Sequence, residues 1–286
     1  MASFNGTKID FVTNTLLGVM EQGRIPWIMP YDNNVGIARS YVTKKHYSIS
    51  NQMYILAQQG YNDGEFIGAK AVENDKNLSL SPNAKPITIF FALPPMMREK
   101  NVDGHKSTEW YGGFTKTHTV YNVNDVIGIG KETLTPSDNF NFSDADTVIS
   151  NYLKKSGVNV IIENVTPCYD NSKDRISIPQ KENFVSETEY YKTIFHEIIH
   201  STAVKSRCNR KGIFNLDDKD EYSAEELVAE IGASYLSALC NIPNYIDTIP
   251  NSAAYCQNWY EKLSSQPSLL LKAAAAAEKA IKYILE

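Results

Sequence analysis

The sequence HEIIH, at positions 196–200, is the feature that most limits what this chain can fold into. An i, i+4 spacing places His196 and His200 on one face of an α-helix, one turn apart, where both imidazoles can hold one metal ion. Such a pair could also cap a helix C-terminus or lie as satisfied polar residues at a core edge. The flanking residues favour metal binding, because they predict a largely buried helix, where polar side chains need a partner. These apolar flanks are Ile194, Phe195, Ile198 and Ile199.

Glu197 lies between the two histidines on an adjacent helix face, within reach of a water molecule at the metal. Zinc accepts two nitrogen ligands and one oxygen ligand and leaves a fourth position open for water. A zinc ion lowers the pKa of that water towards 7, and a neighbouring carboxylate can accept the proton and return it to a leaving amine. The motif therefore predicts Zn²⁺ as cofactor, His196 and His200 as ligands, and Glu197 as the catalytic base.

A third ligand is expected from the downstream sequence EELVAE, at positions 225–230. In zincins whose third ligand is Glu, that residue lies on a downstream helix, and an acidic residue four positions later orients the first histidine. By that pattern Glu226 is the ligand and Glu230 is the partner of His196. Glu225 is the alternative third ligand. In a second alternative neither residue has a role at a metal: Glu226 caps the helix and Glu230 is solvated.

Two Ser-x-x-Glu sequences predict where the helices of this region begin, because each side chain can satisfy a free backbone N–H of the other. Ser186 and Glu189 predict a helix that reaches about Ala203, and Ser223 and Glu226 predict one that reaches about Leu239. Two more helices, separated by Pro267, are expected to close the chain.

The whole pattern predicts an α+β chain of two domains, residues 1–135 and residues 136–286, joined by a polar segment around 131–146. Val158–Glu163 and Arg175–Pro179 are predicted strands. The second is either an edge strand beside the metal, where an extended peptide could pair, or an ordinary short strand within a sheet. The first domain is expected to begin with an amphipathic helix that ends at Gly23. Its further predicted elements are helices at 50–59 and 65–73 and paired strands at 87–93 and 117–123.

The net charge of −5 over 286 residues argues against a strongly basic nucleic-acid-binding protein. That charge is uneven, since residues 1–130 hold 12 basic and 11 acidic side chains, a net of +1. Within them, RSYVTKKHY at 39–47 combines cations with aromatic rings on which bases of a single strand can stack. A solvated loop is the alternative. The candidate DNA-binding residues are Arg39, Lys44, Lys45, Tyr47 and Trp27.

The cysteines and the hydropathy of the chain predict a cytoplasmic protein that does not enter the membrane. The four cysteines lie far apart and form no CxxC pair, which argues against a disulfide framework and is typical of a reducing compartment. No stretch approaches the roughly 18 uncharged apolar residues that a membrane-spanning helix needs.

The second half resembles the metallopeptidase domain of ArdC-type antirestriction proteins, which are carried by mobile elements. Two stretches carry this resemblance, FHEIIHSTAVKSRCNRKGIF and YSAEELVAEIGASYL. The first half is similar to the N-terminal single-stranded-DNA-binding domain of that family, in PW at 26–27, YSISNQMYILAQQGY, ITIFF and VYNVNDV. The resemblance implies a DNA-binding module followed by a gluzincin-like zinc domain. It also implies the same ligands, His196, His200 and Glu226, and the same base, Glu197.

Three functions remain open from the sequence. The first is a zinc metallopeptidase-like protein that binds single-stranded DNA and has an antirestriction role in mobile-element transfer. The second is a protease of a mobile element or phage that cleaves a protein partner. The third is a DNA-binding protein with a non-catalytic, structural zinc site, which the intact Glu197 disfavours because a structural site needs no base.

Overall fold

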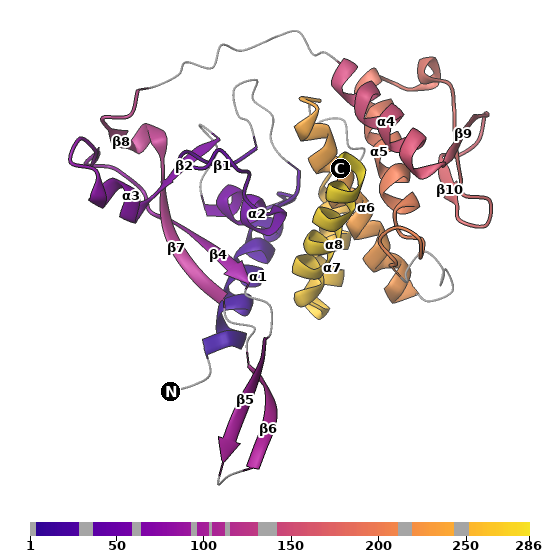
Figure 1. Cartoon of the computed structure of the whole chain (residues 1–286). Coiled ribbons are helices and arrows are strands. Elements are labelled where there is room, and N and C mark those ends of the chain that lie inside the picture. The colour runs from indigo at the N-terminus through magenta and orange to yellow at the C-terminus, as the bar shows by residue number, and fades with distance from the viewer. Residues whose placement is uncertain are drawn as a thin grey trace.

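The computed structural model describes residues 4–28, 37–58, 64–92, 96–102, 105–111, 115–130, 142–210, 219–242 and 252–286. Figure 1 shows the strands of the first half on one side, the helices α6, α7 and α8 in the middle, and α4, α5 and a small sheet on the other side. The predicted α+β fold is confirmed. Within the described ranges, no helix is both long enough and apolar enough to cross a membrane. The expected domain boundary near 135 lies outside the described residues.

The first half is built on a four-stranded sheet of order β1-β2-β7-β4, with the hairpin β5–β6 extending from it (Figure 1). The predicted pairing of the strands at 87–93 and 117–123 is confirmed, because β4 and β7 pair antiparallel from Ile87↔Val120 to Ala92↔Thr115. The strands are β1 Arg39–Ser40, β2 Glu65–Gly68, β3 Ser79–Leu80, β4 Ile87–Ala92, β5 Met96–Val102, β6 His105–Tyr111, β7 Thr115–Asn122 and β8 Val126–Ile127.

Three helices accompany this sheet: α1 Phe4–Glu21, α2 Ile49–Gln58 and α3 Ala69–Asn74. The first two match the predicted helices, and Gly23 follows α1 with a φ of 74°, which glycine adopts without strain. The predicted helix at 65–73 is wrong in its first half. Phe66 and Ile67 are buried in β2, because pairing with β7 satisfies the backbone there and both faces of the strand are covered.

Side-chain amides of α2 close the free edge of β4. Asn51 Nδ2 donates to the carbonyl of Phe90 at 2.7 Å, and the Phe90 N–H donates back to Asn51 Oδ1 at 2.9 Å. Gln58 makes the same paired contact with Thr88, at 3.0 and 3.1 Å. The helix therefore satisfies the backbone groups that a further strand would otherwise take, which protects the edge from pairing with another chain.

We expect Asn51→Leu to lower the free energy of unfolding by about 2–4 kcal/mol, because it leaves the half-buried N–H and C=O of Phe90 without the Asn51 partner and covers them with an apolar side chain. Urea unfolding followed by circular dichroism measures the change. The control is Ser50→Ala at the neighbouring position of α2. Equal stability of the two variants would mean that the amide contacts contribute nothing.

In the second half, the described residues form the helices α4 to α8 and a small sheet of order β10-β11-β9. The position of Arg175–Ile178 (β11) in the centre of that sheet corrects the prediction of an edge strand there. β11 pairs with β9 on one side and with β10 on the other, so β10 is the strand with a free edge near α5. The elements are α4 Ser143–Ser156, β9 Asn159–Ile162, β10 Cys168–Asp170, β11 Arg175–Ile178, α5 Glu187–Ser201, α6 Lys219–Leu239, α7 Ser252–Ser265 and α8 Ser268–Leu285.

One of the two predicted helix starts is confirmed. Ser186 Oγ accepts a hydrogen bond from the Glu189 N–H at 3.2 Å, so it caps α5. The second capping box is wrong, because α6 begins at Lys219 and Ser223 lies inside it, where its hydroxyl accepts from Lys262 Nζ. Ser223 is therefore a contact between α6 and α7 and not a helix cap.

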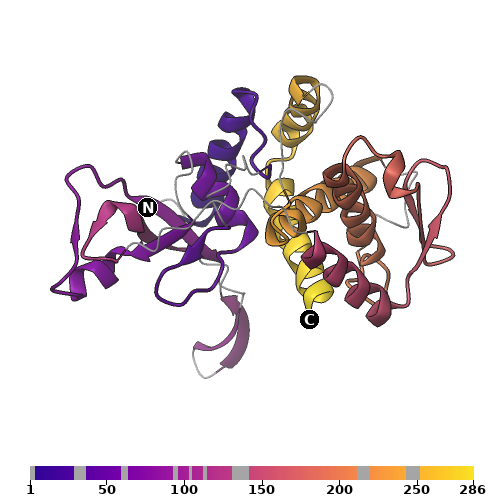
Figure 2. The same cartoon turned by 90° about the horizontal axis from the view of Figure 1, so that it is seen from above.

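The two halves share one hydrophobic core, in which α1 and α2 pack against α7 and α8. Figure 2 shows the C-terminal helices lying between the strands of the first half and the small sheet of the second. Trp27 packs edge-on against Trp259, with ring centroids 6.1 Å apart, and its carbonyl accepts from Ser234 Oγ at 2.6 Å. At the other end of the contact, the N–H of Ile49 donates to Glu278 on α8. The first half thus depends on the second for part of its core.

Candidate metal centre

The α5 helix places the HEIIH residues at a junction between helix α6 and strand β10. His200 and Glu197 are both buried, at 7% and 6% exposure, and the apolar residues around them fill the core. α6 approaches α5 closely because Gly232 has no side chain. A Cβ atom at that position would lie 2.6 Å from Ile199 Cδ1. The close crossing of the two helices brings the carboxylates of α6 to the histidines of α5.

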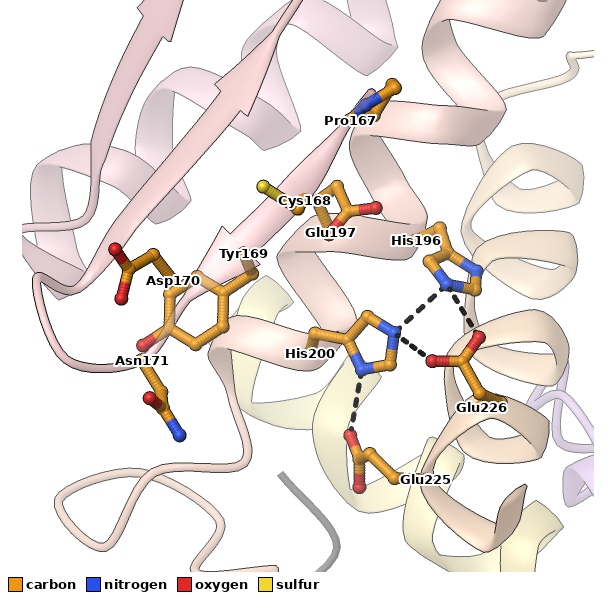
Figure 3. Close-up of a pocket in the computed structure, with 10 residues that line it drawn as sticks. All are labelled: Pro167, Cys168, Tyr169, Asp170, Asn171, His196, Glu197, His200, Glu225 and Glu226. Carbon is orange, nitrogen blue, oxygen red and sulfur yellow. Dashed lines mark hydrogen bonds and ion pairs between the residues drawn. The ribbon is translucent and has the colours of Figure 1, made fainter. Parts of the chain in front are cut away.

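The structure brings together the three residues that were predicted as metal ligands (Figure 3). The two Nε2 atoms of His196 and His200 lie 3.0 Å apart. The carboxylate of Glu226 lies between them, with one oxygen 3.5 Å from His196 Nε2 and the other 3.3 Å from His200 Nε2. Two nitrogens and a carboxylate oxygen therefore converge on one point.

This donor set fits a divalent cation. With metal–ligand bonds of about 2.0–2.1 Å, the ligand atoms of a tetrahedral site lie about 3.3–3.4 Å apart. The three observed separations scatter around that value, and the chemistry of two imidazoles and one carboxylate is that of zinc and related metals. The arrangement also leaves one side open towards a pocket of about 410 Å³.

Glu197 faces the same pocket from the turn of α5 that carries His196. The backbone N–H of Tyr169 in β10 donates to its carboxylate, which holds the side chain beside the histidines. Burial raises the pKa of Glu197, and the neighbouring histidines lower it only in part. A raised pKa makes the Glu197 carboxylate a stronger proton acceptor than an exposed glutamate.

The electrostatics of the histidine–carboxylate group follow from burial and charge. Burial alone would lower the pKa of His200, but the carboxylates of Glu225 and Glu226 raise it to about 9. Burial would likewise raise the pKa of Glu226, yet hydrogen bonds from His196 and His200 hold it well below its usual value. Without a metal, the group is therefore held together by a charged histidine and a charged carboxylate.

Glu225 and Glu230 have other positions than the sequence suggested. Glu225 contacts the outer nitrogen of His200, Nδ1, at 3.3 Å and does not join the ligand group. Glu230 is near Tyr255, where its negative charge, after burial, raises the pKa of the phenol. Of these two glutamates, Glu225 is thus the one beside a histidine, and that histidine is His200 and not His196.

Arg210 is a further residue near the histidines that no sequence pattern indicated. It binds Glu225 through two nitrogens at 2.6 and 2.8 Å. It lies ten residues after the HEIIH motif, in a loop that carries several cations. A buried glutamate beside a histidine signals that a cation is needed nearby, but spacing does not tell which of the loop residues supplies it.

The candidate DNA-binding residues divide into two groups. Arg39 Nε and Lys44 Nζ both contact Glu65 Oε1, at 2.8 and 2.9 Å, and Lys45 is exposed. Tyr47 is half-buried against Phe66, and burial raises its pKa to about 12. These four residues lie close together in sequence, in β1 and the loop that follows it, beside β2.

Trp27 does not belong with them. At 1% exposure, its ring is a core contact between the two halves and cannot stack on a nucleic-acid base in this structure. The sequence could not predict this burial, because a tryptophan after a helix end gives the same local pattern whether it faces solvent or a helix from another part of the chain.

Comparison with known protein families divides the chain in two. Residues 9–121 match the N-terminal domain of the anti-restriction factor ArdC. Residues 147–276 match a zincin-like metallopeptidase domain. The second match contains the whole histidine–carboxylate group, and the first contains the loop with Arg39 and Lys45.

Individual proteins agree with this division. DNA primase TraC of Escherichia coli is 23% identical over 96% of the chain, although the chain spans only about 20% of the length of that relative. The crystal structure of antirestriction ArdC protein from the R388 plasmid, in its metal-free form, has a TM-score of 0.77 and 24% identity and covers 97% of this chain and 96% of that one. Its Mn(II)-bound form has a TM-score of 0.73 and 23% identity over the same shares.

These solved structures confirm the fold over nearly the whole length. With a match to the ArdC N-terminal domain in its first half and to a zincin-like metallopeptidase domain in its second, the chain resembles ArdC-type antirestriction proteins in both halves.

Proposed function

We propose that this protein is a zinc-dependent peptidase that also binds single-stranded DNA and acts in antirestriction during the transfer of a mobile element. The observation that carries the enzymatic part is the place of Glu197. It is a buried carboxylate with a raised pKa, on the turn between two histidines that share Glu226.

Different residues of the chain have separate roles in the proposed hydrolysis. When bound, zinc would supply the Lewis acid that polarises a carbonyl and makes water acidic. His196, His200 and Glu226 would hold it. Glu197 would accept the proton of the attacking water and pass it to the leaving amine, and the N–H of Tyr169 keeps the Glu197 carboxylate aimed at the pocket.

A protease that cleaves a protein partner and a protein with a purely structural metal are the competing functions. A structural metal site in proteins usually has four protein ligands and no open position. The three ligands among the described residues and the pocket beside them favour a catalytic site. A cytoplasmic location fits all these functions, and the free state of the four cysteines is compatible with it.

Calorimetric titration of the purified, metal-free protein with zinc tests the site. We expect one ion per chain and the release of a proton, because below about pH 9 His200 carries a second ring proton that it must lose to bind. The apparent affinity should then fall about tenfold for each pH unit below 9. Comparison of buffers with different heats of ionisation counts the protons. Binding without proton release, or no binding, would contradict the assignment of His200.

Binding of single-stranded DNA is supported by the basic loop beside β2 and by the match to the ArdC N-terminal domain. Each phosphate contact to a single strand contributes about 0.7 to the slope of log affinity against log salt concentration. At 0.1 M salt this corresponds to about fivefold in affinity. We expect Lys45→Ala to weaken binding by about that factor. Glu65→Gln should strengthen it, because this change removes the negative charge shared by Arg39 and Lys44.

Fluorescence anisotropy with a labelled oligonucleotide at several salt concentrations measures both changes. Lys282→Ala, on the exposed side of the C-terminal helix, is the control for a loss of positive charge elsewhere. If Lys45→Ala and Lys282→Ala have the same affinity, the DNA contact lies on another surface.

A further inference from the structure

Arg210 connects the end of helix α5 to the first half of α6. Its guanidinium donates to both oxygens of Glu225, and it also donates to Thr202 Oγ1 and to the carbonyl of Ile199, each at 2.8 Å. Four hydrogen bonds from one planar group leave it little freedom to move. The carboxylate of Glu225, at 3% exposure, is therefore held in one orientation.

Glu225 in turn contacts only one of the two nitrogens of His200. Its Oε1 lies 3.3 Å from Nδ1, while Nε2 points at Glu226 and His196 (Figure 3). A carboxylate paired with arginine can only accept a hydrogen bond, so Nδ1 must carry the proton. Nε2 is then the ring nitrogen that gives up its proton and offers its lone pair when a metal binds.

The chain after α5 is folded so that Arg210 reaches this place. The N–H of Cys208 donates to Thr202 and the N–H of Arg210 donates to Ala203, both at 2.8 Å, which returns the chain along the end of the helix. Asn209, just before Arg210, has a φ of 53°, in the left-handed region that asparagine tolerates. The turn therefore presents the arginine side chain to the gap between α5 and α6.

Arg207, from the same turn, has a similar set of contacts that do not include the histidines. It binds Asp174 and donates to the carbonyls of Ser201 and Ser156. Its side chain is 4% exposed and that of Arg210 is 11% exposed. The two arginines thus resemble each other in burial and in structural contacts, and they differ in that only Arg210 touches Glu225.

We propose that Arg210 and Glu225 form a positioning pair that fixes the proton of His200 on Nδ1 and aims Nε2 at the cation. This inference rests on the metal site of the proposed function, but it concerns how the chain prepares that site. Neither residue touches the metal or the reacting atoms. Both act through His200.

The experiment compares Arg210→Met and Glu225→Gln with Arg207→Met as the matched control, using zinc affinity measured by competition with a chromophoric chelator. Loss of a partner behind a ligating histidine typically weakens metal binding 10- to 100-fold. We expect that loss for Arg210→Met and for Glu225→Gln, and less than about a twofold change for Arg207→Met. The double variant of Arg210 and Glu225 should bind no more weakly than the weaker single one, because both changes remove the same support.

A second readout uses no metal. Nitrogen-15 NMR of the metal-free wild-type protein should show a slowly exchanging proton on Nδ1 of His200, and Arg210→Met and Glu225→Gln should lose it. Arg210→Lys, which keeps the charge but not the paired hydrogen bonds, serves if Arg210→Met does not fold. A folded Arg210 variant with wild-type zinc affinity and a protected Nδ1 proton would overturn the inference. Absence of zinc binding in the wild type would instead contradict the proposed function, and the Nδ1 proton would still decide the role of the pair.

Discussion

Glu197→Gln is expected to abolish peptide hydrolysis while the protein still binds one zinc ion per chain. Positioned general bases contribute about 100- to 10,000-fold to rate, and Gln cannot accept the proton at this position. The amide has nearly the same shape, and its oxygen can still accept from the N–H of Tyr169. Since burial of the charged carboxylate is unfavourable, the variant should be at least as stable as the wild type.

The measurement is the turnover of a fluorogenic peptide library, together with metal content and melting temperature. Glu189→Gln is the matched control, because Glu189 lies on the same helix two turns away and pairs with Lys192. Hydrolysis at the wild-type rate by Glu197→Gln would exclude Glu197 as the base. Retention of antirestriction by an inactive Glu197→Gln protein would show that shielding of DNA, and not proteolysis, protects the incoming strand.

His200→Ala is expected to have the largest effect on metal binding. The free energy of zinc binding to structural sites with four ligands is about 10–16 kcal/mol. One ligand therefore contributes on the order of 3 kcal/mol, or more than about a hundredfold in affinity. The loss should exceed that of any change at Arg210 or Glu225, because the ligand itself is removed. It also leaves Glu226 without one of its two histidine partners.

Zinc affinity by chelator competition measures this change, with His118→Ala as the control. His118 is exposed on β7, where it stacks edge-on against Phe91, and it lies in the other half of the chain. Equal zinc affinity of His200→Ala and His118→Ala would place the metal elsewhere in the protein.

The features that were predicted correctly depend on short stretches of chain. The shared face of His196 and His200 follows from helix periodicity alone, and the start of α5 follows from one serine that caps it. The strand pair β4 and β7 was recognisable from the apolar runs at 87–93 and 117–123. Glu226, chosen from its spacing on the next helix, lies within 3.5 Å of both histidines, and its role as a metal ligand stays a prediction.

The features that were predicted wrongly depend on contacts between distant segments. Trp27 is buried because α7 happens to cover it, and β11 is a central strand because β10 pairs on its outer side. Ser223 lies within α6 because the helix begins a turn earlier. In each case the local sequence is compatible with both environments.

By itself, the sequence determined that this protein has a buried helix with two histidines on one face and a carboxylate, Glu197, between them, because those relations are set by helix geometry. Only the tertiary structure decided which acidic residue supports which histidine. That choice depends on the angle and closeness of α5 and α6, which Gly232 permits, and on a turn that brings Arg210 to Glu225. Such contacts join residues that follow no regular spacing in the sequence, so they can be identified only in the folded chain.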